Sequence, residues 1–186
     1  PRLRGEFPAY HSNEMIDRES IMDVLRTVDD PEMPINIVDL GLVERVQVES
    51  ANGEDNSASV SIDLLPTFVG CPALDMIRND VERAVRELPD VGDVHVEFHN
   101  DPPWTVDRIT EAGRASLQEH GVTVPESGSD IKRPMLEFTP LQLSTVPCPY
   151  CGSSETQLES RFGPTRCRMI YYCRACKNSF EHMKRV

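Results

Sequence analysis

No stretch of this chain approaches the roughly 18 consecutive apolar residues that a membrane-spanning helix needs. The first 14 residues lack the apolar segment of a secretory signal and read as a loose tail. Internal repeats and low-complexity segments are also missing. With 39% hydrophobic and 27% charged residues, the composition is typical of a soluble globular protein. We therefore expect no membrane contact and no export.

Positive charge is scarce, because 19 Lys and Arg face 31 Asp and Glu, which leaves a net charge of −12. Residues 148–186 are the exception, with seven basic and three acidic side chains. The acidic remainder would repel a phosphate backbone, so we expect no nucleic acid binding there. A nucleic-acid-binding module in the basic segment stays open as an alternative, and its binding would weaken steeply with salt.

Hydrophobic periodicity predicts six elements before residue 125. The first helix has Asp17 as its N-cap, and the break at Asp29-Asp30-Pro31 follows it. In chain order we expect a helix from Asp17 to Val28, strands at 42–48 and 60–64 that pair as a hairpin, a helix from Pro72 to Leu88, a strand at 94–98 and a helix at 106–120. The predicted fold class is α+β, a small α/β domain of order α-β-β-α-β-α.

Four of the six cysteines form two C-x-x-C pairs, Cys148 with Cys151 and Cys173 with Cys176, separated by 21 residues. Such pairs in a reducing, cytoplasmic compartment are more often metal ligands than disulfides. Four thiolates complete the tetrahedral shell of zinc, so the site should be structural. A redox disulfide pair and a rubredoxin-like iron site stay open, although Lys177 stands where such electron carriers have Gly. Cys167 is either a small buried side chain or a ligand, and we leave it outside the site.

Prolines and small polar residues replace the periodicity between residues 125 and 147, which is typical of a connector. We therefore expect four parts. They are a tail at 1–14, an α/β domain at 15–124, a linker at 125–146 and a zinc ribbon at 147–186.

Cys71 precedes Pro72, a residue suited to the first position of a helix. Its sulfur would then lie where helix-end amides favour an anion, so we expect a lowered thiol pKa. Gly70 permits the close turn, and Thr67 could donate a hydrogen bond to the sulfur. The residues alone leave two interpretations open, a reactive or metal-binding thiolate and an ordinary buried cysteine.

A thiol enzyme would need a base, and His95 and His99 are the nearest histidines to Cys71 along the chain. Four strand residues separate these side chains by roughly 13 Å, too far to share a metal, so we expect solvated polar positions. Asp29, Glu32 and Asp39 flank the loop before the first strand. They are ordinary turn residues or functional acids.

Three segments carry a resemblance to a known family. DPEMPINIVDLGLV, GCP at residues 70–72 and DPPWTVDRITEAGRASLQEHGV resemble the family that contains SufT and the eukaryotic cytosolic iron–sulfur targeting proteins, over about residues 15–124. With PTFVGCPA and the C-terminal FGPTRCRMIYYCRACKNSF added, the whole chain resembles the PaaD family, the accessory subunits of the phenylacetyl-CoA epoxidase system.

The resemblance implies an iron–sulfur-assembly-type domain joined to a zinc ribbon, in an accessory subunit that is not itself an enzyme. It implies that Cys71 handles iron or a cluster for epoxidase subunits or their reductase, with Asp39 and Glu32 bordering the same pocket. No Glu-x-x-His pair on the predicted helices could build a di-iron site, so catalysis would reside in partner subunits. Because a cluster normally needs four ligands, two chains could share one through Cys71 in a homodimer, or a partner could supply the others.

Overall fold

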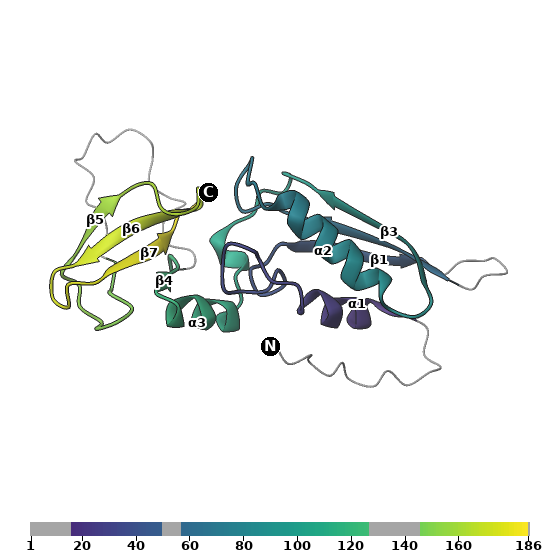
Figure 1. Ribbon diagram of the computed structural model, residues 1–186, viewed down its shortest axis with the longest axis horizontal. Coiled ribbons are helices and arrows are strands. Elements are labelled where there is room, and N and C mark those ends of the chain that lie inside the picture. Colours follow the sequence, from purple (N-terminus) through teal and green to yellow (C-terminus); the bar gives the residue numbers. More distant parts are fainter. Residues whose placement is uncertain (1–15, 50–56, 127–145, 186) are drawn as a thin grey trace, which may run out of the picture.

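The computed structural model describes residues 16–49, 57–126 and 146–185, which form two sheets side by side in an elongated molecule (Figure 1). The first sheet has the order β1-β2-β3, with β1 antiparallel and β3 parallel to β2. Helices α1 and α2 cover this sheet. The bounds are α1 Arg18–Leu25, β1 Val43–Glu49, β2 Ala58–Leu64, α2 Leu74–Arg86 and β3 Val91–Phe98.

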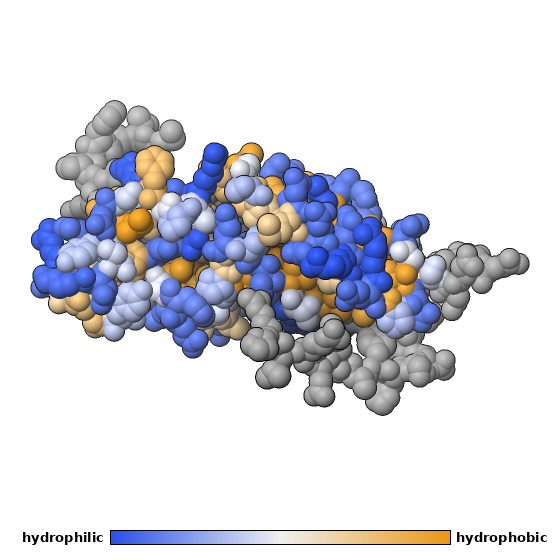
Figure 2. Space-filling model, viewed as in Figure 1, coloured by the Kyte–Doolittle hydropathy of each residue, from blue (hydrophilic) through white to orange (hydrophobic). Residues whose placement is uncertain are grey.

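The alternation of side chains decides which face of the sheet the helices cover. In β2, Val60, Ile62 and Leu64 are fully buried, whereas Ser61 and Asp63 lie partly exposed on the other face. Helix α2 buries Ile77, Val81 and Val85, the stripe that its sequence spacing predicts. The predicted hairpin, second helix and half-buried strand are therefore confirmed. Hydrophilic residues predominate on the face of the molecule that Figure 2 shows.

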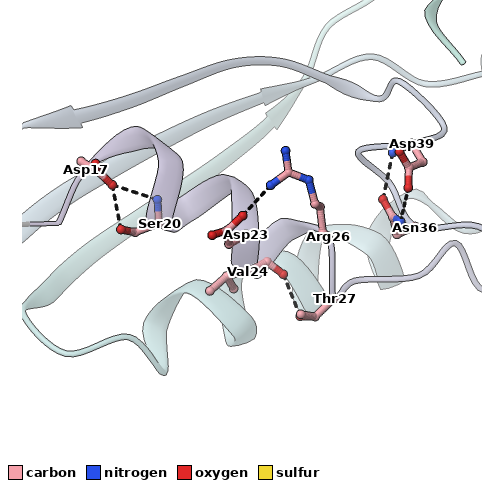
Figure 3. A network of polar contacts seen from close by, with 8 residues as sticks. All are labelled: Asp17, Ser20, Asp23, Val24, Arg26, Thr27, Asn36 and Asp39. Atoms are coloured by element: carbon pink, nitrogen blue, oxygen red, sulfur yellow. Dashed lines mark hydrogen bonds and ion pairs between the residues drawn. The ribbon is translucent and has the colours of Figure 1, made fainter. Parts of the chain in front are cut away.

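Helix α1 begins where its capping signal predicts. The Asp17 carboxylate accepts hydrogen bonds from the Ser20 backbone N–H at 2.8 Å and from its hydroxyl at 2.7 Å (Figure 3). The helix ends at Leu25, three residues earlier than expected. Val28 is nevertheless buried, because the turn after the helix directs it into the same core.

The predicted third helix is divided in two. A short 3-10 turn, η1 Val106–Arg108, precedes α3 Glu111–Glu119, because Ile109 between them is extended with ψ of 125°. Thr110 then restarts the helix as an N-cap, since its hydroxyl accepts from the Gly113 N–H at 3.0 Å.

The second sheet has the order β4-β7-β6-β5 and joins the two predicted domains. Strands β5 Thr156–Ser160, β6 Arg168–Cys173 and β7 Ser179–Met183 form an antiparallel ribbon. Strand β4, Val122–Thr123, comes from the end of the α/β domain and pairs in parallel with β7. Met183 of β7 is fully buried in the core of the α/β domain. The ribbon is thus docked on that domain.

Within these described ranges, no helix is long and apolar enough to cross a bilayer. Residues 127–145, most of the predicted linker, and the predicted tail at 1–14 lie outside them.

Candidate functional site

The two C-x-x-C pairs converge on one site in the ribbon. Cys148 and Cys151 lie in the turn before β5, Cys173 ends β6, and Cys176 lies in the turn before β7. Their four sulfurs lie within 4.8 Å of one another, with Cys148 Sγ 3.7 Å from Cys176 Sγ and Cys151 Sγ 3.6 Å from Cys173 Sγ. A tetrahedron of sulfurs around a metal at about 2.3 Å has edges of about 3.8 Å. The four cysteines are therefore arranged so that they could hold one metal ion.

The backbone supports thiolates at this site. The Asn178 backbone N–H, helped by its side-chain amide, lowers the pKa of Cys176 to about 6. The Ser153 N–H acts in the same direction on Cys151, but desolvation and hydrogen bonds with the other three thiols raise its pKa to about 12. The pKa values of Cys151 and Cys176 are therefore shifted in opposite directions, and a bound cation would favour the thiolate form of both.

The left-handed residues of the two turns agree with this interpretation. Gly152 (φ 71°) follows the first pair, and Lys177 (φ 63°) occupies the equivalent position after the second. The Lys177 N–H donates to the Cys173 carbonyl at 2.9 Å, so Lys177 forms the same left-handed turn in which a glycine would be expected. Among the described residues, the ribbon's own apolar core contains five buried residues, and two of them belong to the four-cysteine group. Without the ion, little would hold the ribbon folded.

Cys71 lies in the turn directly before α2, half-buried against the core. Gly70 adopts a left-handed conformation with φ of 81°, as the turn requires. The predicted lowering of the thiol pKa is wrong. Burial raises the pKa of Cys71, as do the negative charges of Glu32 and Asp30, and these effects outweigh one hydrogen bond from the Ala73 N–H. Because α2 starts only at Leu74, the sulfur does not gain the full set of helix-end amides.

A pocket of about 190 Å³ opens beside Cys71, between the α/β domain and the ribbon. Glu32, Thr67 and Cys71 line it from the first domain, so three of the four residues proposed from the sequence meet here. From the ribbon, Thr165 and Cys167 line the opposite side. Sequence reasoning weighed Cys167 only as a further ligand within the ribbon and left it out, because no local pattern in the chain places it beside Cys71.

Asp39, the fourth residue proposed from the sequence, is not among the residues that line this pocket. Its carboxylate accepts from the Asn36 amide at 2.7 Å (Figure 3) and from the Thr110 hydroxyl at 2.7 Å. Its backbone carbonyl accepts from the Thr110 N–H at 3.0 Å. Asp39 therefore ties the loop before β1 to the start of α3.

Arg168 of β6 holds the two domains together beside the pocket. It is 6% exposed and donates to the Glu32 carbonyl at 3.0 Å and to the Thr165 hydroxyl at 2.8 Å. It also pairs with Glu181 of β7 at 2.6 Å. This buried arginine, one of seven basic residues in the ribbon segment, is unavailable to an external partner.

His95 and His99 lie on the polar face of β3. Their Nε2 atoms are 3.0 and 3.6 Å from the two carboxylate oxygens of Glu97, and His99 also contacts Asp63 at 3.2 Å. Neither histidine lines the Cys71 pocket. The polar positions expected for them are confirmed, but the expected separation of their side chains is wrong, because both rings lean toward the carboxylate of Glu97 between them.

Comparison with known proteins relates each half of the chain to a described family. Residues 18–98 match a family described as an iron–sulfur cluster assembly protein, and residues 133–184 match the PaaD zinc beta ribbon domain.

Relatives of two kinds are similar to this chain. An Escherichia coli K12 protein, provisionally named as one of the subunits of 1,2-phenylacetyl-CoA epoxidase, is 33% identical over 88% of this chain and 90% of that protein. The Fe-S protein maturation auxiliary factor YitW of Bacillus subtilis 168 is 36% identical over 54% of this chain and 92% of that protein. A crystal structure of the DUF59 domain of unknown function from Bacillus anthracis covers 53% of this chain and 89% of its own, with a TM-score of 0.46 and 31% identity.

Proposed function

Since this chain belongs to the PaaD family and carries both its iron–sulfur-assembly-type domain and its ribbon, we propose that it is a non-catalytic maturation subunit of a phenylacetyl-CoA epoxidase. Acting in the cytoplasm, it assists the assembly of an iron–sulfur cluster or di-iron centre in a partner subunit. Relatives of its N-terminal half that are named maturation factors support this role. The assignment to an epoxidase rests on the E. coli relative.

The ribbon's resident metal, in this proposal, is zinc held by Cys148, Cys151, Cys173 and Cys176. Four thiolates leave no open position for water, so the ion shapes the ribbon and takes no part in chemistry. Metal analysis of the purified chain tests this choice. One zinc per chain in a colourless protein supports it, whereas a red protein with one iron would indicate a rubredoxin-like site.

The observation that carries the proposal is the position of Cys71, in a pocket that Glu32 and Thr67 also line. Thiolate and carboxylate donors suit iron. Because burial and nearby acids raise its pKa, Cys71 is a protonated thiol at neutral pH until a cation displaces the proton. A thiol that loses its proton only when it binds a metal ion suits a carrier of iron better than it suits a catalytic nucleophile. No histidine lines this pocket to act as a base.

Anaerobic iron loading tests the role of Cys71. The zinc-loaded wild type should bind iron and show thiolate-to-iron absorption, and Cys71→Ser should bind none beyond background. Val69→Ser is the matched control, because this exposed residue lies on the same loop and does not line the Cys71 pocket. Equal iron loading of Cys71→Ser and the wild type would refute the proposal.

Co-expression with epoxidase subunits tests the client. The iron content of those subunits should fall when the chain is omitted or carries Cys71→Ser, and should be restored by Val69→Ser. Unchanged iron content in all three cases would remove the assembly role.

A further inference from the structure

We propose that Cys167 of the ribbon is the second thiolate of the Cys71 site, so that a single chain holds its iron between two sulfurs, one from each domain. This inference rests on the proposed iron-handling function and adds to it. It gives the ribbon a direct part in binding, where the family resemblance implies only a structural module.

The pocket itself brings the two thiols together. Cys71 lies in the turn before α2 and Cys167 in the turn before β6, and both line the same space of about 190 Å³. At roughly 30 Å³ per water, this volume holds about six water molecules, enough for a metal ion with exchangeable ligands. Cys167 also has a small electrostatic effect that raises the pKa of Cys71, as expected of neighbouring thiols.

Cys167 does not behave as an apolar filler. It is 7% exposed, yet it belongs to neither of the two apolar core clusters among the described residues. Its sulfur instead lies 3.1 Å from the Thr165 hydroxyl. A buried cysteine kept only for its size would be packed among aliphatic or aromatic side chains.

Hydrogen bonds also prepare Cys167 to act as a thiolate. The Thr165 hydroxyl lies 3.1 Å from Cys167 Sγ and accepts from Arg168 Nε at 2.8 Å. An arginine can only donate, so the hydroxyl proton of Thr165 is free to point at the sulfur. Such outer hydrogen bonds orient ligands and support their charge at metal sites.

Two further oxygen-bearing side chains line the same pocket. Glu32 lines the pocket with the thiols, and only its backbone carbonyl is used by Arg168. Thr67 also lines the pocket and is 7% exposed, and in the part of the chain that the structure describes no partner hydrogen-bonds its hydroxyl. Two thiolates suit ferrous iron or one iron of a cluster. On binding, each thiol releases one proton to solvent.

The test titrates the zinc-loaded full chain anaerobically with ferrous iron against a competing chelator. The variants are Cys71→Ser, Cys167→Ser and Phe162→Ser. Phe162 is the control because it lies in the same loop, is 82% exposed and does not line the pocket. One zinc per chain and an unchanged unfolding midpoint verify that the ribbon of each variant is intact.

Loss of an outer hydrogen bond at a metal site weakens binding about 10- to 100-fold, so loss of a ligand should exceed that range. We expect Cys167→Ser to bind iron at least about 100-fold more weakly than the wild type, with Phe162→Ser unchanged. Bound iron should also protect both Cys71 and Cys167 from alkylation, measured by mass spectrometry.

Two results would overturn the inference and are distinguishable. If Cys71→Ser loses iron while Cys167→Ser binds as the wild type does, and iron leaves the alkylation of Cys167 unchanged, the second thiolate is refuted and the proposed function stands. If Cys71→Ser itself binds iron normally, the proposed function fails and the shared site fails with it.

Discussion

Replacing Arg168 with methionine should loosen the ribbon from the α/β domain without disturbing the metal site. Methionine keeps much of the apolar stem but removes the guanidinium. The lost contacts are the ion pair with Glu181 at 2.6 Å and the bonds to the Glu32 carbonyl at 3.0 Å and Thr165 at 2.8 Å. No other donor within the described residues bonds Glu181 Oε2, so in Arg168→Met the charge of this carboxylate has no partner.

The expected loss follows from the burial of the pair. Removing one partner of a fully buried ion pair costs about 3–5 kcal/mol. The Arg168 side chain is 7% exposed, but that of Glu181 is 27% exposed, so solvent screens part of the orphaned charge. We therefore expect a loss of about 3 kcal/mol, the lower end of that range. With a urea slope of about 2 kcal/mol/M, the midpoint should fall by about 1.5 M.

Two signals follow the two domains separately in one urea titration. Trp104 is the only tryptophan, is 3% exposed and donates to the Leu40 carbonyl at 3.0 Å, so its fluorescence reports on the α/β domain. Release of metal to a chromophoric chelator reports on the ribbon. The two curves should coincide in the wild type, and in Arg168→Met metal release should shift to lower urea than the fluorescence change.

The double variant Arg168→Met/Glu181→Gln provides the control. If the cost arises from the orphaned carboxylate, neutralising Glu181 should restore part of the lost stability. Unchanged midpoints for Arg168→Met by both probes would refute the reasoning that this contact couples the domains.

Three further perturbations test the same interface. Burial, with a smaller effect from the charge of Arg185, lowers the pKa of His182 from 6.5 to about 4. The free energy of unfolding should therefore have its full value above pH 6.5 and fall by up to about 3 kcal/mol as the pH drops from 6.5 to about 4. His182→Gln should lack this component when its urea midpoints at pH 7 and pH 5 are compared with the wild type, and an equal acid loss in both proteins would contradict it. Met183→Ala, at a fully buried site in the shared core, should cost about 2–5 kcal/mol in urea unfolding, and a loss below about 1 kcal/mol would mean that the ribbon does not contribute to that core. Gly121→Ala, at φ 77° and with an added Cβ that would collide with the Tyr150 hydroxyl, should cost about 1–2 kcal/mol by thermal unfolding, whereas an unchanged or higher melting temperature would argue against this backbone conformation.

The elements with strong local signals were predictable from the sequence. The Asp17 cap, the alternation along β2 and the stripe on α2 depend on neighbours within a few residues, and the structure confirms each of them. The division at Ile109 and Thr110 was missed because the apolar spacing continues through a break that only the backbone at Ile109 creates. The two-residue strand β4 carries no periodic signal at all.

The candidate site shows the same division. The C-x-x-C spacing predicted four converging sulfurs, because each pair needs only its own turn to present two ligands. The predicted direction of the Cys71 pKa shift was wrong. Burial by the folded chain raises this pKa, and so do the charges of Asp30 and Glu32, which lie in a loop about 40 residues away in the sequence. Cys167 could not be placed beside Cys71 for the same reason.

The sequence by itself determined α1, the β1–β2 hairpin, α2 and β3, the convergence of four cysteines and the family, since these depend on residue types at short, regular separations. Only the tertiary structure decided that β4 and Met183 join the ribbon to the α/β domain, and that Cys167 lies across a pocket from Cys71. The physical reason is that long-range packing sets burial, electrostatic surroundings and contacts between distant residues, and no local pattern in the chain encodes them.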